Sequence, residues 1–107
     1  MYTSVEIDEI KDMVIAEVPR AERIYLFGSY ARGTAREQSD LDIAVLMDAD
    51  LNWRDRNDML NRLYNGTAQK GYNVDFLLKR ADLFFAESEL PTLSRVILRE
   101  GKLLWKS

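Results

Sequence analysis

A glycine–serine pair and two nearby aspartates are the residues of this chain whose types and spacing best suit chemistry. Gly28 and Ser29 follow a β-branched and aromatic run, and Asp40 and Asp42 open a second apolar run. A glycine after a buried strand lets the backbone approach a phosphate closely, and the amides of a following helical turn form an anion site. Carboxylates that come shortly afterwards suit metal ions. This order is the one that transfer of a nucleotide from a triphosphate would need.

Two further features add to this pattern. Residues two apart on a strand point the same way, with Cα atoms roughly 6.5–7 Å apart, so Asp40 and Asp42 share one surface. Asp75 lies in a third apolar run and joins them if its strand lies next to theirs. The hydroxyl of Ser29 can donate to a phosphate oxygen, and Arg32 lies near enough to the turn to neutralise phosphate charge.

A cation is the simplest way to keep three such carboxylates together. Within about 5 Å they would repel by roughly 3 kcal/mol per pair at an effective dielectric constant near 20. A domain of this size has only about 5–15 kcal/mol of stability to lose. Mg²⁺ prefers oxygen ligands and shares phosphate oxygens with nucleotides, and a pair of ions can clamp both oxygens of an in-line displacement.

Each feature alone has a plainer reading, and the joint occurrence gives the pattern its weight. A Gly-Ser pair after a strand is usually only a turn, and an Asp-x-Asp strand is more often a solvated face. The aromatic residues are interpreted as packing rather than binding residues: Trp53 and Trp105 as packing anchors, Phe84 and Phe85 as buried.

The composition excludes several classes of site. The chain has 107 residues, a net charge of −3, and neither cysteine nor histidine. Disulfides, thiolate zinc sites and imidazole bases are therefore excluded, and acid–base or metal chemistry must rest on carboxylates. No basic stripe is present, which makes a nucleic acid an unexpected direct substrate. No signal core or membrane-length apolar run is seen, so we expect a cytoplasmic protein without a membrane partner.

The spacing of apolar residues and the positions of glycine and proline predict one α/β domain over residues 1–107. It is a small mixed β-sheet with helices packed against it. In the second strand, alternation places Leu41, Ile43, Val45 and Met47 on one face and both aspartates on the other. Asn65-Gly66 could interrupt the third helix, and Gly71 could cap it. The expected helices are 3–18, 30–32, 52–71, 81–90 and 92–100, and the expected strands are 23–27, 40–47, 73–79 and 102–105.

These residues resemble a known family. The run Gly28-Ser29-x-Ala31-Arg32-Gly33, followed by Ser39-Asp40-x-Asp42, is similar to the signature of the polymerase-beta-type nucleotidyltransferase superfamily. Val74-Asp75-Phe76 resembles its third-carboxylate strand. The short length is most similar to the minimal nucleotidyltransferases of bacteria and archaea.

The resemblance implies a polymerase-beta-like fold and a role for each matching residue. Gly28 and Ser29 would hold the triphosphate of a nucleoside triphosphate, with Arg32 and Ser39 as further nucleotide-binding residues. The three aspartates, Asp40, Asp42 and Asp75, would be both the catalytic residues and the ligands of Mg²⁺, as two ions.

The resemblance also implies a partner. Minimal nucleotidyltransferases are commonly paired with a helical HEPN-type toxin, and the small transferase then resembles an antitoxin that adenylylates a tyrosine of that toxin in a hetero-oligomer. Two other functions stay open: an antitoxin that acts by binding alone, and a small-molecule nucleotidyltransferase of the aminoglycoside type whose acceptor site is completed by another subunit. The sequence has no readable code for the base, so ATP as substrate is an expectation from the family.

Overall fold

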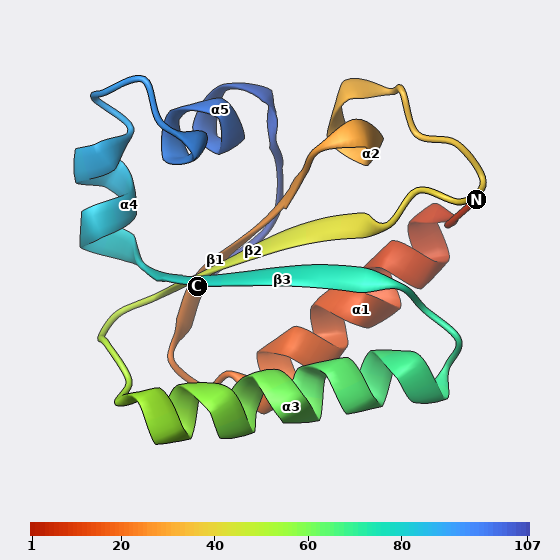
Figure 1. Ribbon diagram of the computed structural model, residues 1–107, viewed down its shortest axis with the longest axis horizontal. Helices are drawn as coiled ribbons and strands as arrows, with labels where there is room; N and C mark the ends of the chain where they lie inside the picture. The colour runs from red at the N-terminus through yellow and green to blue at the C-terminus, as the bar shows by residue number, and fades with distance from the viewer.

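A four-stranded sheet with helices on both faces forms the frame of the protein in the computed structural model, which describes residues 1–107 (Figure 1). The helices are α1 (Ser4–Glu17), α2 (Ser29–Arg32), α3 (Trp53–Gln69), α4 (Ala81–Glu87) and α5 (Leu93–Glu100). The strands are β1 (Ala21–Phe27), β2 (Leu41–Met47), β3 (Val74–Arg80) and β4 (Lys102–Lys106). The predicted order and types of the elements are confirmed.

The sheet is mixed, with strand order β3-β2-β1-β4. The strands β2 and β3 run parallel, whereas β1 is antiparallel to both β2 and β4. The end of β1 therefore lies at the same end of the sheet as the starts of β2 and β3. α3 is the crossover helix that joins the two parallel strands.

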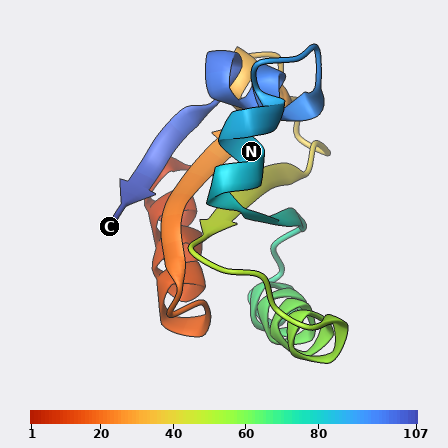
Figure 2. The ribbon, with the colours of Figure 1, turned by 90° about the vertical axis from the view of Figure 1, so that its left-hand side faces the viewer.

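The two faces of the sheet are covered by different helices. Figure 1 shows α1 and α3 on one side and α2, α4 and α5 on the other, and the side view in Figure 2 keeps these two layers apart. The larger core cluster joins α1 and α3 to the predicted inner face of β2, Leu41, Ile43, Val45 and Met47. A smaller cluster, with Ala44, Leu46, Phe84 and Ile97, packs α4 and α5 against the opposite face.

The helix boundaries follow local signals. The hydroxyl of Thr3 accepts a hydrogen bond from the Glu6 N–H while the Glu6 carboxylate accepts one from the Thr3 N–H, and the two bonds together form a capping box. Thr92 caps α5 in the same way, with its hydroxyl accepting from the Arg95 N–H. α4 ends at Glu87, three residues earlier than predicted, because the chain turns before Pro91.

Two expectations about α3 were wrong. Asn65-Gly66 does not interrupt the helix, because Gly66 lies where α3 passes α1 and a Cβ there would press on Met13 Cε at 2.9 Å. Trp53, expected as a packing anchor, is 71% exposed, since the first turn of α3 points it to solvent. Trp105, by contrast, packs against the larger core cluster as expected, and Phe84 is fully buried.

None of the helices combines the length and the apolar character that crossing a lipid bilayer requires.

Candidate active site

One row across the sheet brings the predicted site residues together. Phe27, the last residue of β1, pairs with Asp42, and Asp42 pairs with Asp75 in the parallel register of β2 and β3. Neighbouring strands lie about 4.8 Å apart, so the two aspartates are direct neighbours on the same face. Asp75 faces away from the buried Val74 and Phe76. The predicted convergence of acidic side chains from β2 and β3 thus holds for this pair at the level of register.

The glycine turn lies directly against Asp42. Gly28 has φ 72° and ψ −151°, a conformation that residues with a side chain avoid. A Cβ placed on Gly28 would overlap the Asp42 carboxyl oxygen. The glycine therefore serves two purposes here: it turns the chain from β1 into α2, and it leaves room for the Asp42 carboxyl at the mouth of that turn.

Charge and burial act together on Asp42. Partial burial raises the pKa of its carboxyl, and the negative charges of Asp75 and Asp40 raise it further, while the Arg32 guanidinium lowers it. A carboxyl that is pushed toward its neutral form by neighbouring acids is one that a cation would stabilise in its charged form. This electrostatic arrangement, with an all-oxygen donor set, fits a hard divalent ion.

The side chains as they stand do not gather three acidic groups close enough to hold an ion by themselves. Asp40 precedes β2 and is exposed, and so is Asp75. Mg²⁺ is usually bound by one or two carboxylates together with waters and substrate phosphates, rather than by an all-protein cage. The paired Asp42 and Asp75 therefore fit Mg²⁺ in the presence of a nucleotide, with Asp40 as the adjacent third carboxylate.

The remaining predicted residues lie around this row. Arg32, at the end of α2, is within electrostatic reach of Asp42 and forms an ion pair of 3.9 Å with Glu100. Ser39 accepts a hydrogen bond of 2.9 Å from the Arg36 N–H, which closes a turn in the loop before Asp40. The hydroxyl of Ser39 thus has a structural partner in the loop, and its role in nucleotide binding stays a prediction.

The acidic row lies on an open surface. None of the four hollows of the protein includes Gly28, Ser29, Asp42 or Asp75. A hollow of about 280 Å³ lies beside the site, lined among others by Tyr2, Ser39, Tyr72 and Asn73. The acids are accordingly accessible to a large acceptor as well as to a small one.

Sequence reasoning missed two residues next to the site. Tyr2 and Tyr30 pack against each other with ring centroids 5.8 Å apart, beside the start of α2. No periodicity indicates such a contact, because the two residues are 28 positions apart and Tyr2 precedes α1 whereas Tyr30 lies in α2.

Comparison with known proteins supplies a family. Residues 8–107 match the family described as polymerase beta, nucleotidyltransferase. The protein adenylyltransferase MntA of Shewanella oneidensis is 33% identical to this chain over 88 residues, which are 82% of this chain and 56% of that protein. The chain thus spans little more than half the length of this relative.

Two solved structures share the fold. One is a toxin–antitoxin structure with AMP-PNP, which matches this chain with a TM-score of 0.66 and 27% identity. The match covers 94% of this chain and 73% of the chain in that structure. The other is the tri-AMPylated HEPN toxin of Shewanella oneidensis in complex with an MNT antitoxin, with a TM-score of 0.60 and 27% identity. The match covers 94% of this chain and 69% of the chain in that structure.

Proposed function

Because the chain belongs to the polymerase beta nucleotidyltransferase family, we propose that it transfers AMP from ATP to a hydroxyl of a helical HEPN-type protein, and so acts as that protein's antitoxin. The acceptor hydroxyl is that of a tyrosine. The observation that carries the proposal is the row in which Asp42 and Asp75 are paired beside the Gly28 turn. The similarity to MntA, and to complexes with AMP-PNP and with an AMPylated toxin, supports the choice of nucleotide and acceptor.

Each candidate residue has its own role in the proposed reaction. Gly28 and Ser29 hold the triphosphate through backbone amides and the Ser29 hydroxyl, and Arg32 offsets its charge. Asp40, Asp42 and Asp75 would hold Mg²⁺, which would neutralise phosphate charge and so favour in-line displacement of pyrophosphate. Asp75 also accepts the proton of the attacking hydroxyl, because its carboxyl is exposed on the face where an acceptor would dock. Positioning and charge neutralisation supply most of the rate, as in phosphoryl transfer generally.

The openness of the site supports a protein acceptor. The carboxylates lie on an open face and outside every hollow of the chain, so the chain itself offers no enclosed pocket for a small acceptor. A protein surface can cover such a face and exclude water when it docks.

The proposal is tested with α-labelled ATP, Mg²⁺ and the product of the gene next to this chain's. We expect label on that protein with the wild-type chain and none with Asp42→Asn. Asp58→Asn is the matched control, since Asp58 lies on an exposed face of α3 away from the site. Label that survives Asp42→Asn would contradict the assignment.

The same variants separate the alternative functions. Full protection of cells by the Asp40→Asn/Asp42→Asn double variant would favour an antitoxin that acts by binding alone. Labelled aminoglycoside formed without any partner would favour a small-molecule transferase.

A further inference from the structure

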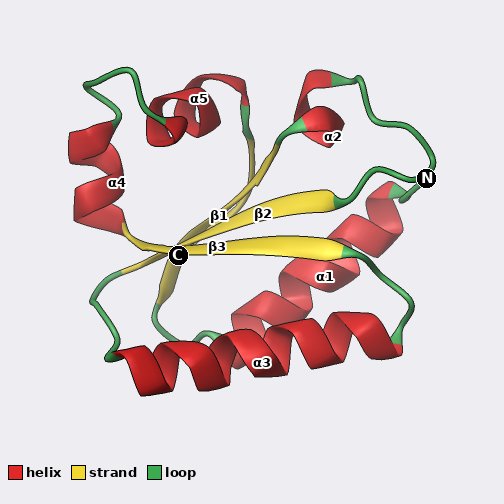
Figure 3. Ribbon diagram, viewed as in Figure 1, coloured by secondary structure: helices red, strands yellow, loops and turns green.

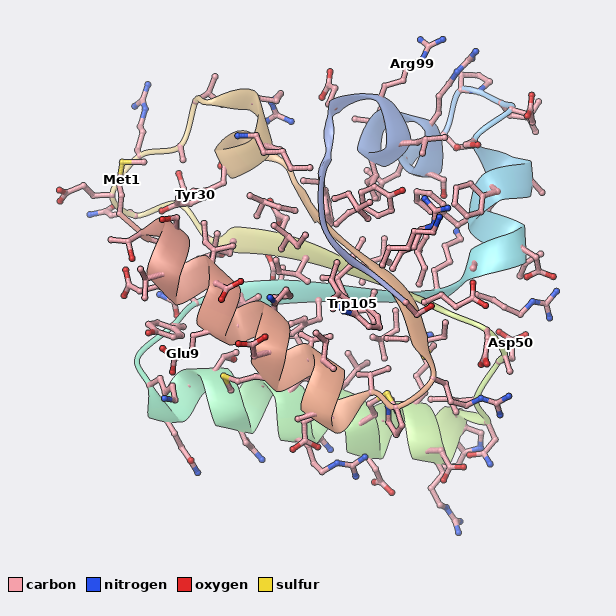
Figure 4. The ribbon with its side chains drawn as sticks, turned by 180° about the vertical axis from the view of Figure 1, so that it is seen from behind. Met1, Glu9, Tyr30, Asp50, Arg99 and Trp105 are labelled. Atoms are coloured by element: carbon pink, nitrogen blue, oxygen red, sulfur yellow. The ribbon has the colours of Figure 1, made fainter.

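Tyr2 connects two segments that form the edge of the candidate active site. Its backbone N–H donates a hydrogen bond of 3.1 Å to the Tyr30 hydroxyl, and its own hydroxyl accepts one of 2.6 Å from the Asn73 N–H. Its ring packs on Tyr30 and, edge to face, on Tyr72 at 5.6 Å. Figure 4 shows Tyr30 and Met1 at the same edge of the molecule.

Both ends of this connection are next to site residues. Tyr30 follows Ser29 in α2, so it belongs to the turn that would hold the triphosphate. Asn73 directly precedes β3, two residues before Asp75. Its carbonyl accepts a hydrogen bond of 3.1 Å from the Leu41 N–H, which ties it to the residue before Asp42.

The connection bridges two segments that are exposed at this edge. The loop from Gly33 to Asp40 is exposed over most of its length, and Asn73 is exposed as well. Figure 3 shows this loop running past the start of the chain between α2 and β2. Without the Tyr2 hydroxyl, the Asn73 N–H loses its partner, and the start of β3 keeps its pairing with β2 and the hydrogen bond of 3.0 Å from the Phe76 N–H to the Tyr64 hydroxyl of α3.

We propose that Tyr2 is a positioning residue for nucleotidyl transfer, which fixes the Ser29 turn and the Asp75 carboxyl relative to each other through Tyr30 and Asn73. This inference rests on the proposed function. The Tyr2 hydroxyl holds the β3 side, and the Tyr2 N–H holds the α2 side. Loss of the hydroxyl loosens the start of β3, whereas the contacts of α2 with β1 and β2 stay.

The conservative substitution Tyr2→Phe tests the β3 side, because it keeps the ring and removes only the hydroxyl. We expect kcat for AMP transfer to the partner protein to fall about three- to tenfold, with the KM for ATP within about twofold of wild type, since small misplacements of a reacting group lower the rate. We also expect the Asn73 amide to exchange its hydrogen about tenfold faster by NMR. Tyr30→Phe, on the α2 side, should instead raise the KM for ATP.

Tyr72→Phe is the matched control. It removes a hydroxyl of the same cluster that donates to Glu9 of α1 at 3.3 Å and touches neither α2 nor β3. Unchanged kcat in Tyr2→Phe, or an equal loss in Tyr72→Phe, would overturn the role of Tyr2. If the wild-type chain transfers no AMP, the proposed function fails, while the exchange rate of the Asn73 amide still decides whether the connection exists.

Discussion

Burial and neighbouring negative charge both disfavour the ionised carboxylate of Asp42. Asp42 pairs with Phe27 and Asp75 in the sheet, lies against Gly28, and feels the charges of Asp40 and Asp75. A fold selected for stability alone would not place three acids here, because strands disfavour Asp and like charges repel. Such local conflicts are expected at functional sites.

Replacement of Asp42 should separate stability from activity. The fold raises the pKa of the Asp42 carboxyl, so the ionised carboxylate at neutral pH lowers the stability of the folded protein. This cost is absent well below the ordinary pKa of the carboxyl, where the group is protonated in both states. In a buffer without divalent ions, Asp42→Asn should therefore stabilise the protein at pH 7 by about 0.5 kcal/mol, a gain kept small by solvent screening. The gain should shrink as the pH falls through the raised pKa of Asp42 and vanish below the ordinary carboxyl pKa of about 4. Urea unfolding at both pH values measures it, and AMP transfer should fall by about 100-fold or more.

A loss of stability in Asp42→Asn at pH 7 would show that the carboxylate is held by favourable contacts instead. Asp58→Asn, on the exposed face of α3, is the control and should change neither stability nor activity.

Gly28→Ala should be costly for two reasons, the positive φ and the overlap with the Asp42 carboxyl. We expect a loss of about 2 kcal/mol in the free energy of unfolding together with a strong loss of activity. Gly71→Ala is a matched control, because Gly71 also has a positive φ of 77° but open space around a Cβ. That control should lose about 1 kcal/mol and keep its activity. Equal losses of stability in Gly28→Ala and Gly71→Ala would show that overlap with the Asp42 carboxyl is not the cause.

At the scale of elements, most of the fold could be predicted because local signals agree with one another. Thr3 and Thr92 start helices as capping residues, and alternation in β2 separates the core residues from the aspartates. The family signature indicated the candidate site residues, whose catalytic and binding roles stay a prediction. What the sequence could not give was contact between distant residues: the register of Asp42 with Asp75, the exposure of Trp53, and the role of Gly66 beside Met13.

The cap of α5 gives a prediction at this scale. The Thr92 hydroxyl accepts from the Arg95 N–H and donates to the Glu87 carbonyl at 2.8 Å, which links α5 to the end of α4. Thr92→Ala should lower the free energy of unfolding by about 1 kcal/mol, as loss of a helix cap usually does. Thr92→Ser keeps the hydroxyl and should retain most of the wild-type free energy of unfolding. Chemical denaturation of the two variants measures the difference, and equal stability would contradict a capping role.

At the scale of the whole molecule, the site links strands from both halves of the chain, so ligand binding should stabilise the entire fold. With Mg²⁺ and a non-hydrolysable ATP analogue at ten times the dissociation constant, we expect about 1.4 kcal/mol of added stability. This corresponds to a rise in Tm of several degrees for a domain of this size. Thermal unfolding with the analogue, with and without EDTA, measures the shift, and a shift that persists in EDTA would contradict the proposed metal site.

The two outer strands of the sheet have a consequence for self-association. With the order β3-β2-β1-β4, one side of β3 and one side of β4 expose backbone groups that pair with no other strand. β4 carries the exposed Lys102 and Lys106, whereas the basic residues of β3, Lys79 and Arg80, are ion-paired with Glu87 and with Asp50 and Asp82. Lysines on an open margin repel an identical strand from a second copy. The two lysines discourage the β4 margins of two molecules from pairing into one continuous sheet, and the β3 margin is covered in part by α3, whose Tyr64 and Arg56 hydrogen-bond the Phe76 N–H and the Leu78 carbonyl.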